Sequence, residues 1–301
     1  MINITLLGTS CMVPTKDRNT SAFYLEYKGE GILFDCGEGT QRQMNIANIN
    51  RNKVKKVLIS HWHGDHVSGL VGLIQTMNNA QDDMILEIFG PSGTKEKMKH
   101  LMGSACFDNN LNIKITEIKE TNTLKTVFEN KDYYIDAISL DHGIPAMAYS
   151  FTEKDTLKIK LAKIKEIGIP EGPILSQLQE GRDIEFNGKK YKNKELTTVK
   201  QGKKFSIIMD TSYTKNAITI AEDADVLICE ATYSDRHAEK GDHYKHLTVT
   251  QAALIANNAG VGRLIMTHFS QRYSDVKELE EEAKNVFSKT VAGYDFMKLK
   301  L

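Results

Sequence analysis

The sequence lacks the features that mark several large classes of protein. It holds only four cysteines, none of them in a CxxC pair, so neither a disulfide framework nor a cysteine-rich zinc ribbon is expected. No apolar run approaches the roughly 20 residues that a membrane-spanning helix needs. The first residues show neither the charged segment nor the long apolar segment of a signal peptide. We therefore expect a cytoplasmic protein with reduced thiols and no membrane partner.

The formal net charge of the chain is zero. The 39 basic and 39 acidic side chains cancel, so the total charge does not indicate a nucleic-acid partner, and any basic surface must be local. Apolar residues make up 41% and charged residues 26% of the 301 residues. Both values are ordinary for a globular protein and speak against disorder. A chain of this length can bury a core of its own.

What the sequence does contain is an alternation of strand-like and helix-like segments. Runs of β-branched and aromatic residues closed by Gly or polar residues predict strands at 2–8, 21–27, 31–37, 54–60, 85–89, 112–118, 132–140, 205–210, 224–233 and 263–269. Helical spacing of apolar residues, as at Leu70, Leu73, Ile74 and Met77, predicts helices over 70–77, 248–260 and 275–287. The pattern predicts an α/β protein.

The segment from Thr152 to Lys204 differs in composition from the rest of the chain. Residues 151–204 hold thirteen Lys and Arg against eight Asp and Glu, an excess of five in a chain that is otherwise neutral overall. A plain surface insertion would be tolerated, but about 50 residues is long for a loop without structure. We expect a basic insertion with secondary structure or a function of its own.

The most informative stretch follows the predicted strand at 54–60. Three histidines and an aspartate fall within six residues there: His61, His63, Asp65 and His66. Imidazole and carboxylate groups are ligands suited to zinc. This density predicts metal binding, whereas a lone histidine would be read as structural.

Six residues cannot complete two metal sites, so further ligands should come from later strand ends. His142, Asp210 and His268 each stand where a predicted strand gives way to a loop, which is the usual place for chemistry on a rigid sheet. Taken singly, each would more often be a capping or loop residue. Together with the HxHxDH stretch they form a set.

In this order and spacing, the sequence resembles the metallo-β-lactamase superfamily, and within it the short form of the RNase Z family, whose members process the 3′ end of tRNA. The resemblance covers essentially the whole chain. It is carried by the HxHxDH stretch and by PTKDRN at 14–19, FDCGEGTQRQ at 34–43, LDHGIPAMAYSF at 140–151, MDTSY at 209–213 and THFSQRY at 267–273. It implies a single catalytic domain over 1–301 with the αββα sandwich fold, interrupted by an arm at 152–204.

The resemblance also implies roles for individual residues. One zinc ion would be held by His61, His63 and His142, a second by Asp65, His66 and His268, and Asp210 would bridge them. Asp65 would in addition orient the nucleophile. His246 would act as the general acid, with Glu230 orienting its imidazole. Cys229 stands where a histidine often precedes that glutamate in the family, and we read it as a buried thiol.

Contacts with RNA are implied at the cleft and in the arm. Lys16 and Arg18 match a family loop that holds RNA near the site, although an ordinary polar turn is the alternative, and Arg272 matches a family residue at the cleft edge. Gly172 with Pro173 matches the Gly-Pro turn of the arm that holds tRNA. The arm's lysines suit backbone phosphates rather than a base sequence. The expected enzyme is a zinc-dependent endoribonuclease, a homodimer, that removes the 3′ trailer from precursor tRNA and leaves a tRNA 3′-hydroxyl and a 5′-phosphorylated trailer.

Two other functions fit parts of this pattern. The same scaffold could serve a hydrolase of another class, such as a thioester hydrolase or a sulfatase, because a fold does not fix a function. The basic arm argues against that alternative. A non-catalytic RNA-binding module is the second alternative, and such a protein would be expected to lack some metal ligands, whereas every ligand position is filled here.

Overall fold

The computed structural model describes residues 1–78, 84–107 and 111–301. The chain divides into two compact units. The main unit comprises Met1–Glu129, Ile135–Phe151 and Lys204–Leu301, and the arm unit comprises Asn130–Tyr134 and Thr152–Lys203.

The first sheet of the main unit is built from the N-terminal half of the chain and the last strand. Its seven strands run in the order β18-β1-β2-β3-β4-β5-β6. Pairing is antiparallel from β18 to β3 and parallel from β3 to β6. The strands are β1 (Ile2–Gly8), β2 (Ala22–Tyr27), β3 (Glu30–Phe34), β4 (Val54–Leu58), β5 (Ile85–Pro91), β6 (Asn112–Ile118) and β18 (Lys298–Lys300).

The second sheet also has seven strands, in the order β17-β16-β15-β14-β9-β8-β7. Strands β14 to β17 pair in parallel. Aromatic side chains join the two sheets, since the Phe34 ring lies 5.5 Å from that of Phe205 and the Tyr27 ring 5.4 Å from that of Phe151. The strands are β7 (Lys125–Glu129), β8 (Tyr133–Asp141), β9 (Pro145–Glu153), β14 (Lys204–Ile208), β15 (Val226–Glu230), β16 (Leu264–Thr267) and β17 (Thr290–Ala292).

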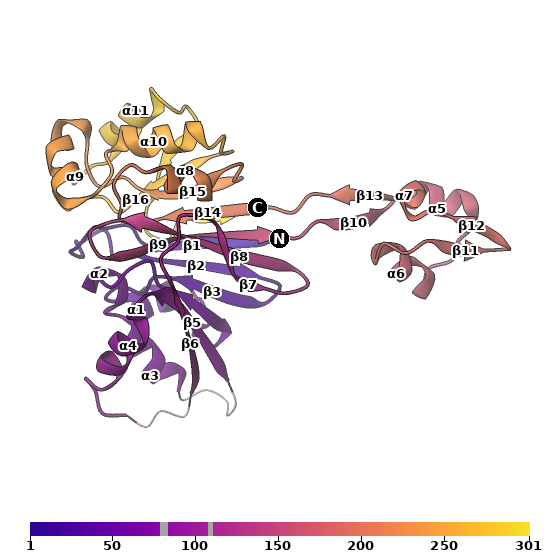
Figure 1. The fold of residues 1–301 in the computed structure, drawn as a ribbon, viewed down its shortest axis with the longest axis horizontal. Coiled ribbons are helices and arrows are strands. Elements are labelled where there is room, and N and C mark those ends of the chain that lie inside the picture. The colour runs from indigo at the N-terminus through magenta and orange to yellow at the C-terminus, as the bar shows by residue number, and fades with distance from the viewer. Residues whose placement is uncertain (79–83, 108–110) are drawn as a thin grey trace. The chain divides into compact units, whose positions relative to one another are not determined.

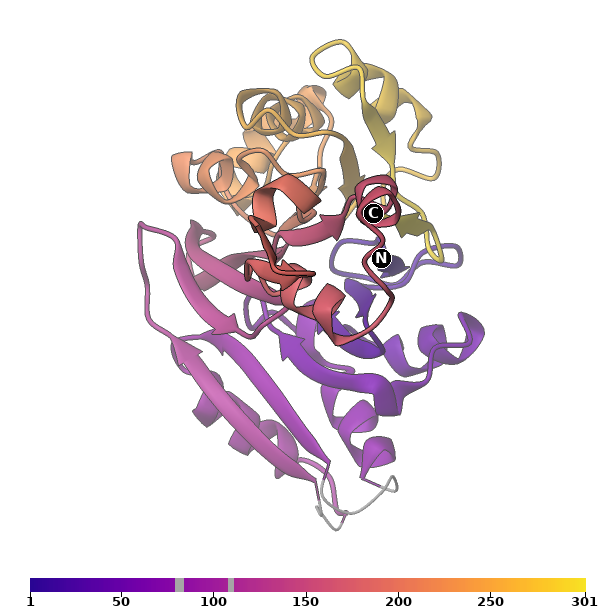
Figure 2. The ribbon, with the colours of Figure 1, turned by 90° about the vertical axis from the view of Figure 1, so that its right-hand side faces the viewer.

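Helices cover the outer face of each sheet, so the main unit has four layers (Figure 1, Figure 2). On the first sheet lie α1 (Thr40–Ile46), η1 (Arg51–Lys53), α2 (Gly64–Val67), α3 (Leu70–Met77) and α4 (Thr94–Met102). The second sheet carries α8 (Lys215–Ala221), η2 (Asp235–His237), α9 (Ala238–Tyr244), α10 (Val249–Asn258) and α11 (Lys277–Lys284). Among the described residues, no helix is long and apolar enough to cross a membrane.

This architecture is the αββα sandwich that the resemblance implies, and several elements match their predictions closely. Helix α3 spans the predicted 70–77, with the four predicted apolar side chains buried. Helix α10 begins at a capping box formed by Thr248 and Gln251. Helix α11 spans Lys277–Lys284 and is therefore shorter than the predicted 275–287. After its end, the N–H groups of Val286 and Phe287 both donate to the Ala283 carbonyl as the chain turns toward β17. Strands β7 and β9 had not been predicted as strands.

The buried cysteines of the main unit are free thiols. Cys36 and Cys229 are both fully buried and unpaired. Burial raises the pKa of the Cys36 thiol to about 12 and that of Cys229 well above its usual value. The interpretation of Cys229 as a buried thiol is therefore confirmed.

The arm unit has secondary structure and a small apolar core of its own. Its elements are β10 (Thr156–Ile159), α5 (Leu161–Ile167), α6 (Pro173–Gln179), β11 (Ile184–Phe186), β12 (Lys189–Tyr191), α7 (Asn193–Leu196) and β13 (Thr197–Lys200). Strands β10 and β13 pair as an antiparallel ribbon. The buried core consists of Ile164, Ile169, Leu178, Ile184 and Leu196. A segment that packs its own core is more than a surface loop.

Candidate metal centre

The HxHxDH stretch lies directly after β4, at the carboxyl edge of the parallel part of the first sheet. His61 and His66 are fully buried, whereas His63 and Asp65 remain accessible. Residues after parallel strands meet at one edge of a sheet, which is where α/β proteins usually place their sites. The short helix α2 turns the chain so that Asp65 and His66 can face the same point.

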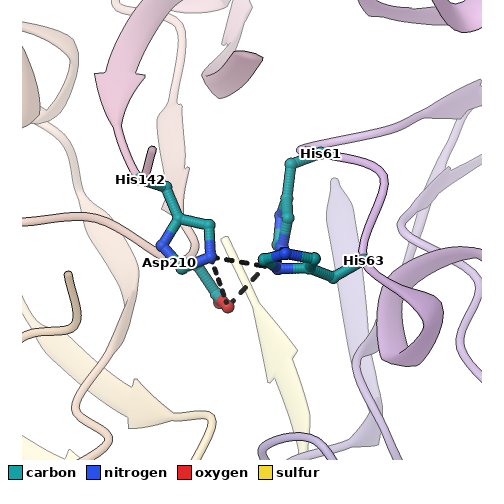
Figure 3. Close-up of side chains that lie close together, drawn as sticks. All are labelled: His61, His63, His142 and Asp210. Carbon is teal, nitrogen blue, oxygen red and sulfur yellow. Dashed lines mark hydrogen bonds and ion pairs between the residues drawn. The ribbon is translucent and has the colours of Figure 1, made fainter. Parts of the chain in front are cut away.

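The other three predicted ligands come from the second sheet. His142 follows β8, Asp210 follows β14 and His268 follows β16. The structure brings all seven side chains into two adjoining groups whose ligand atoms lie within 4.8 Å of one another: His61, His63, His142 and Asp210 in one, and Asp65, His66 and His268 in the other. Figure 3 shows the first group converging on one point.

The geometry of the first group fits a cation. The Nε2 atoms of His61 and His142 lie 3.0 and 3.1 Å from Nδ1 of His63. A single proton cannot lie between all three nitrogens. The Oδ2 atom of Asp210 lies 3.6 Å from both Nε2 atoms. Imidazole and carboxylate donors gathered in this way match the ligand preferences of zinc.

Two buried atoms of the centre make no hydrogen bond to the described residues, although they lie 3.5 Å from each other. They are Nε2 of His66 and Oδ1 of Asp210, and both belong to fully or nearly fully buried residues. A buried polar atom without a hydrogen bond lowers the stability of the folded protein, so its presence indicates a missing partner. A metal ion between the two groups would satisfy both atoms.

The Nδ1 atom of each buried histidine faces an acceptor, which orients the ring with Nε2 toward the centre, as a metal ligand requires. The hydroxyls of Ser60 and Thr232 each donate their own proton to a carboxylate, so they accept from the histidine. The pairs are His61 with Ser60 Oγ (3.0 Å), His66 with Asp35 Oδ2 (2.7 Å), His142 with the Lys245 carbonyl (3.0 Å) and His268 with Thr232 Oγ1 (3.0 Å).

At two positions of the first group, burial favours the neutral state that a histidine ligand needs. It lowers the pKa of His61 well below its usual value, with the neighbouring His66 acting in the same direction. Burial likewise lowers the pKa of His63, assisted by His142. Both imidazoles therefore offer a lone pair at neutral pH.

Four residues around the centre have strained backbone. Met12, Asp35, Lys245 and His268 adopt left-handed conformations, with φ between 55° and 62°. Such a conformation costs a residue other than glycine about 1 kcal/mol or more, and it persists where the surrounding structure demands it. In Met12 it points the backbone N–H at Asp65 Oδ2, 2.7 Å away.

His246 and Glu230 form the predicted pair beside the centre. Nδ1 of His246 lies 3.2 Å from Oε1 of the fully buried Glu230. The backbone N–H of Thr211 and the hydroxyl of Thr232 also donate to that carboxylate. Burial alone would lower the pKa of His246, but the Glu230 and Asp210 carboxylates outweigh it and raise that pKa. The arrangement suits a proton donor.

His246 could instead be counted among the metal ligands, because it gathers with Asp210 and His268. Its Nδ1 atom lies 3.8 Å from Asp210 Oδ2. That nitrogen is already engaged by Glu230 at the shorter distance of 3.2 Å. The geometry therefore favours a residue that carries a proton over one that binds an ion.

Comparison with known proteins places this site in a family. The ribonuclease Z of Thermococcus kodakarensis is 40% identical over 94% of this chain and 89% of its own length. That of Picosynechococcus is 38% identical over 98% of this chain and 95% of its own. The chain belongs to the ribonuclease Z family. The predicted enzyme class, a hydrolase of the ribonuclease Z type, is confirmed with it.

Solved structures agree with this membership. The short form of human tRNase Z aligns with a TM-score of 0.73 and 26% identity, over 99% of this chain and 98% of that one. The metallo-β-lactamase fold protein YhfI of Bacillus subtilis aligns with a TM-score of 0.70 at 18% identity, over 99% and 98% of the two chains, and supports the fold alone. The predicted fold class is therefore confirmed.

One further match covers only part of the chain. The family profile described as Anti-Pycsar protein Apyc1 matches residues 2–159. That range contains the HxHxDH stretch and His142, but it ends before Asp210, His246 and His268. The ribonuclease Z relatives, in contrast, span all of these positions.

The three residues predicted to hold RNA at the cleft lie in different settings. Lys16 is exposed. Arg18 is half-buried, and its Nη2 atom donates to the carbonyls of Tyr273 (2.7 Å) and Ser270 (3.4 Å). The exposed Arg272 lies over the Tyr233 ring, 5.2 Å from its centroid. Arg18 thus joins two loops beside the centre, and RNA contact by any of the three stays a prediction.

In the arm unit, Gly172 and Pro173 are exposed at the start of α6, where Pro173 occupies the first turn. Lys163, Lys165, Lys189, Lys190, Lys192 and Lys194 are exposed as well. Lys160 differs, because its Nζ atom donates to the carbonyls of Lys194 and Glu195. Binding of tRNA by this unit stays a prediction.

Sequence reasoning missed the Thr232 hydroxyl and the Lys245 carbonyl. Thr232 connects the candidate ligand His268 to Glu230, and its place two residues after that glutamate was the available signal. The Lys245 carbonyl holds His142. Any residue can supply a carbonyl, so the sequence carries no sign of that role.

Proposed function

We propose that this protein is a zinc-dependent endoribonuclease that removes the 3′ trailer from precursor tRNA by hydrolysing one phosphodiester bond. The products are a tRNA ending in a 3′-hydroxyl and a trailer beginning with a 5′-phosphate. The observation that supports the proposal is the convergence of seven candidate ligands from two sheets beside the His246–Glu230 pair. Membership of the ribonuclease Z family supports the choice of substrate.

The proposed cofactor is two zinc ions per chain. His61, His63 and His142 would hold one, Asp65, His66 and His268 the other, and Asp210 would bridge them, each of its oxygens facing one group. Bound there, the ions supply Lewis acidity for a phosphodiester and lower the pKa of an attacking water.

The chain's own residues then divide the remaining work. Asp65 accepts from the Met12 N–H at 2.7 Å, which fixes its carboxylate so that it can orient the attacking water. His246, held at Nδ1 by Glu230, keeps Nε2 available to donate a proton to the departing 3′-oxygen. Glu230 acts through His246 and is fully buried, so its role is to position the imidazole.

Substrate contacts are proposed at two places. Lys16, Arg18 and Arg272 would receive the RNA beside the centre, and the exposed lysines around Gly172 and Pro173 would hold folded tRNA by its phosphates. We further propose a cytoplasmic homodimer in which the arm of one subunit serves the centre of the other. Mixing an arm-deleted subunit with an Asp210→Ala subunit would then restore cleavage that neither shows alone.

Zinc analysis combined with cleavage of a 3′-extended tRNA tests the proposal. We expect two zinc ions per chain and a single cut that releases a 5′-phosphorylated trailer. In Asp210→Ala we expect less bound zinc and no turnover, because a shared carboxylate offsets the repulsion between two cations. Two zinc ions retained by that variant would contradict the bridging role, and intact precursor after incubation with the wild-type enzyme would contradict the function.

A further inference from the structure

A cavity of about 630 Å³ opens next to His142. The turn between β8 and β9 forms one wall through Asp141 and Gly143, and residues 120–122 form another. The volume is within the range of small-molecule and cofactor sites. It is large enough for the base and sugar of a nucleotide, and it begins at a side chain of the candidate metal centre.

Lys245 lies along the edge of this cavity. Its Nζ atom is 2.6 Å from Asp141 Oδ1. Its Cδ atom would lie 3.8 Å from a Cβ atom built on Gly143. Lys245 therefore places a cation at the rim of the cavity, one residue before the proposed acid His246.

The backbone of Lys245 is held in place for a separate reason. Its carbonyl accepts the Nδ1–H of His142, and its φ of 55° is in the left-handed region. Asparagine or glycine would accept that conformation at less cost. The pair with Asp141 leaves the Lys245 side chain able to bind another anion, because an exposed ion pair stabilises a protein by only about 0 to 1 kcal/mol.

The cavity is on one flank of the centre and the loop predicted to receive the tRNA end is on the other. The N–H of Met12 reaches Asp65, and Arg18 holds the segment after His268. His142 and the cavity belong to the group formed with His61 and His63. When the phosphate to be cleaved lies at the centre, the RNA strand continues on both sides of it. The tRNA extends in one direction and the trailer in the other.

Resting on the proposed function, we infer that the cavity receives the first nucleotide of the trailer and that Lys245 binds the phosphate that follows it. The carboxylates of Glu120 and Asp141 disfavour a phosphate inside the cavity but can accept hydrogen bonds from a base. Among the described residues, no Phe, Tyr or Trp lines it, so a broad stacking platform does not contribute. The ligand class is single-stranded RNA with little preference for base.

A Lys245→Asn variant tests this inference. Asparagine tolerates left-handed backbone and keeps the carbonyl that holds His142, but it removes the cation. The comparison uses one precursor tRNA with a trailer of either one or four nucleotides, since only the longer trailer has phosphates beyond the cleaved one. We expect the ratio of kcat/KM for the long trailer to that for the short one to fall about tenfold, with Lys245→Arg restoring it.

Salt dependence and a control give the second readout. The slope of log kcat/KM against log salt for the long trailer should become shallower by about 0.7, the value for one phosphate of a single strand. Lys240→Asn removes an exposed cation from the same helix, α9, and should leave the ratio as in the wild type. An equal loss on both trailers, or no loss on either, would overturn the inference.

Binding of a 5′-phosphorylated tetranucleotide separates this inference from the proposed function. If the wild-type enzyme binds the tetranucleotide through Lys245 but cuts no precursor tRNA, the function is wrong and the site stands. If it cuts precursor tRNA while Lys245→Asn changes neither the ratio nor tetranucleotide binding, the function stands and the site is wrong.

Discussion

Asp35 and His66 are joined by a buried contact of 2.7 Å between Oδ2 and Nδ1, although 31 positions separate them in the chain. The other oxygen of Asp35 accepts from the Ser60 N–H, also at 2.7 Å. One carboxylate therefore fixes the loop after β4 and the orientation of a candidate ligand at its far end.

Replacement of Asp35 by asparagine should weaken metal binding without removing any ligand. An amide cannot hold the His66 ring through a charge-assisted bond, and losses of about 10- to 100-fold in affinity are usual for such partners. Zinc titration against a competing chelator measures the effect, and Asp242→Asn, at an exposed position of α9, is the control. Unchanged zinc affinity in Asp35→Asn would show that the contact is only structural.

His246→Ala should separate proton donation from metal binding. We expect zinc content near that of the wild type and a rate of tRNA cleavage lower by about 10² to 10⁴, as for a lost general acid. An aryl phosphodiester with a good leaving group needs no proton donor, so its hydrolysis should fall much less. Equal losses on the two substrates, or loss of zinc, would rule out the assignment.

Replacing residues 158–194 of the arm unit by a short Gly/Ser linker should abolish efficient cleavage of precursor tRNA while a small phosphodiester is still hydrolysed. None of the seven candidate ligands lies in that range.

The slope of log affinity against log salt should become shallower by about 0.9 for each phosphate that the shortened protein no longer binds. A matched variant keeps the apolar core of the unit and changes only six of its exposed lysines to glutamine: Lys163, Lys165, Lys189, Lys190, Lys192 and Lys194. Unchanged affinity and slope in both variants would mean that the arm does not bind tRNA.

Asp295 should make stability depend on pH. Burial raises its pKa to about 6, whereas an unfolded aspartate has a pKa of about 3.9. Between about pH 4 and pH 6 the folded state therefore binds more protons than the unfolded state, and the free energy of unfolding falls as pH rises. Urea denaturation across that window should show this decline in the wild type and a smaller one in Asp295→Asn. Identical slopes would contradict the shifted pKa.

Much of the fold could be predicted because its signals are local. The apolar spacing of α3 and the β-branched run of β4 are each contained in a few residues. His142, Asp210 and His268 could be proposed because each follows such a strand. Strand β9 was missed because it begins at Pro145, after a turn that was read only as a family motif.

Other parts of the centre depend on contacts that no local pattern encodes. The Lys245 carbonyl reaches His142 across 103 positions, and the Thr232 hydroxyl reaches His268 across 36. The role of Arg18 between two loops arises from carbonyls more than 250 positions away. Tertiary packing decides such contacts, so a single sequence does not reveal them.

Each candidate metal position draws its ligands from both sheets, His61, His63, Asp65 and His66 from the first and His142, Asp210 and His268 from the second. A chain in which only one sheet has formed can therefore assemble neither position. Hydrolytic activity would therefore arise only after both sheets have formed and packed together. Newly made or damaged copies in which the sheets have not packed together would not cut the RNA around them. Correct assembly of the fold would thus control the nuclease activity.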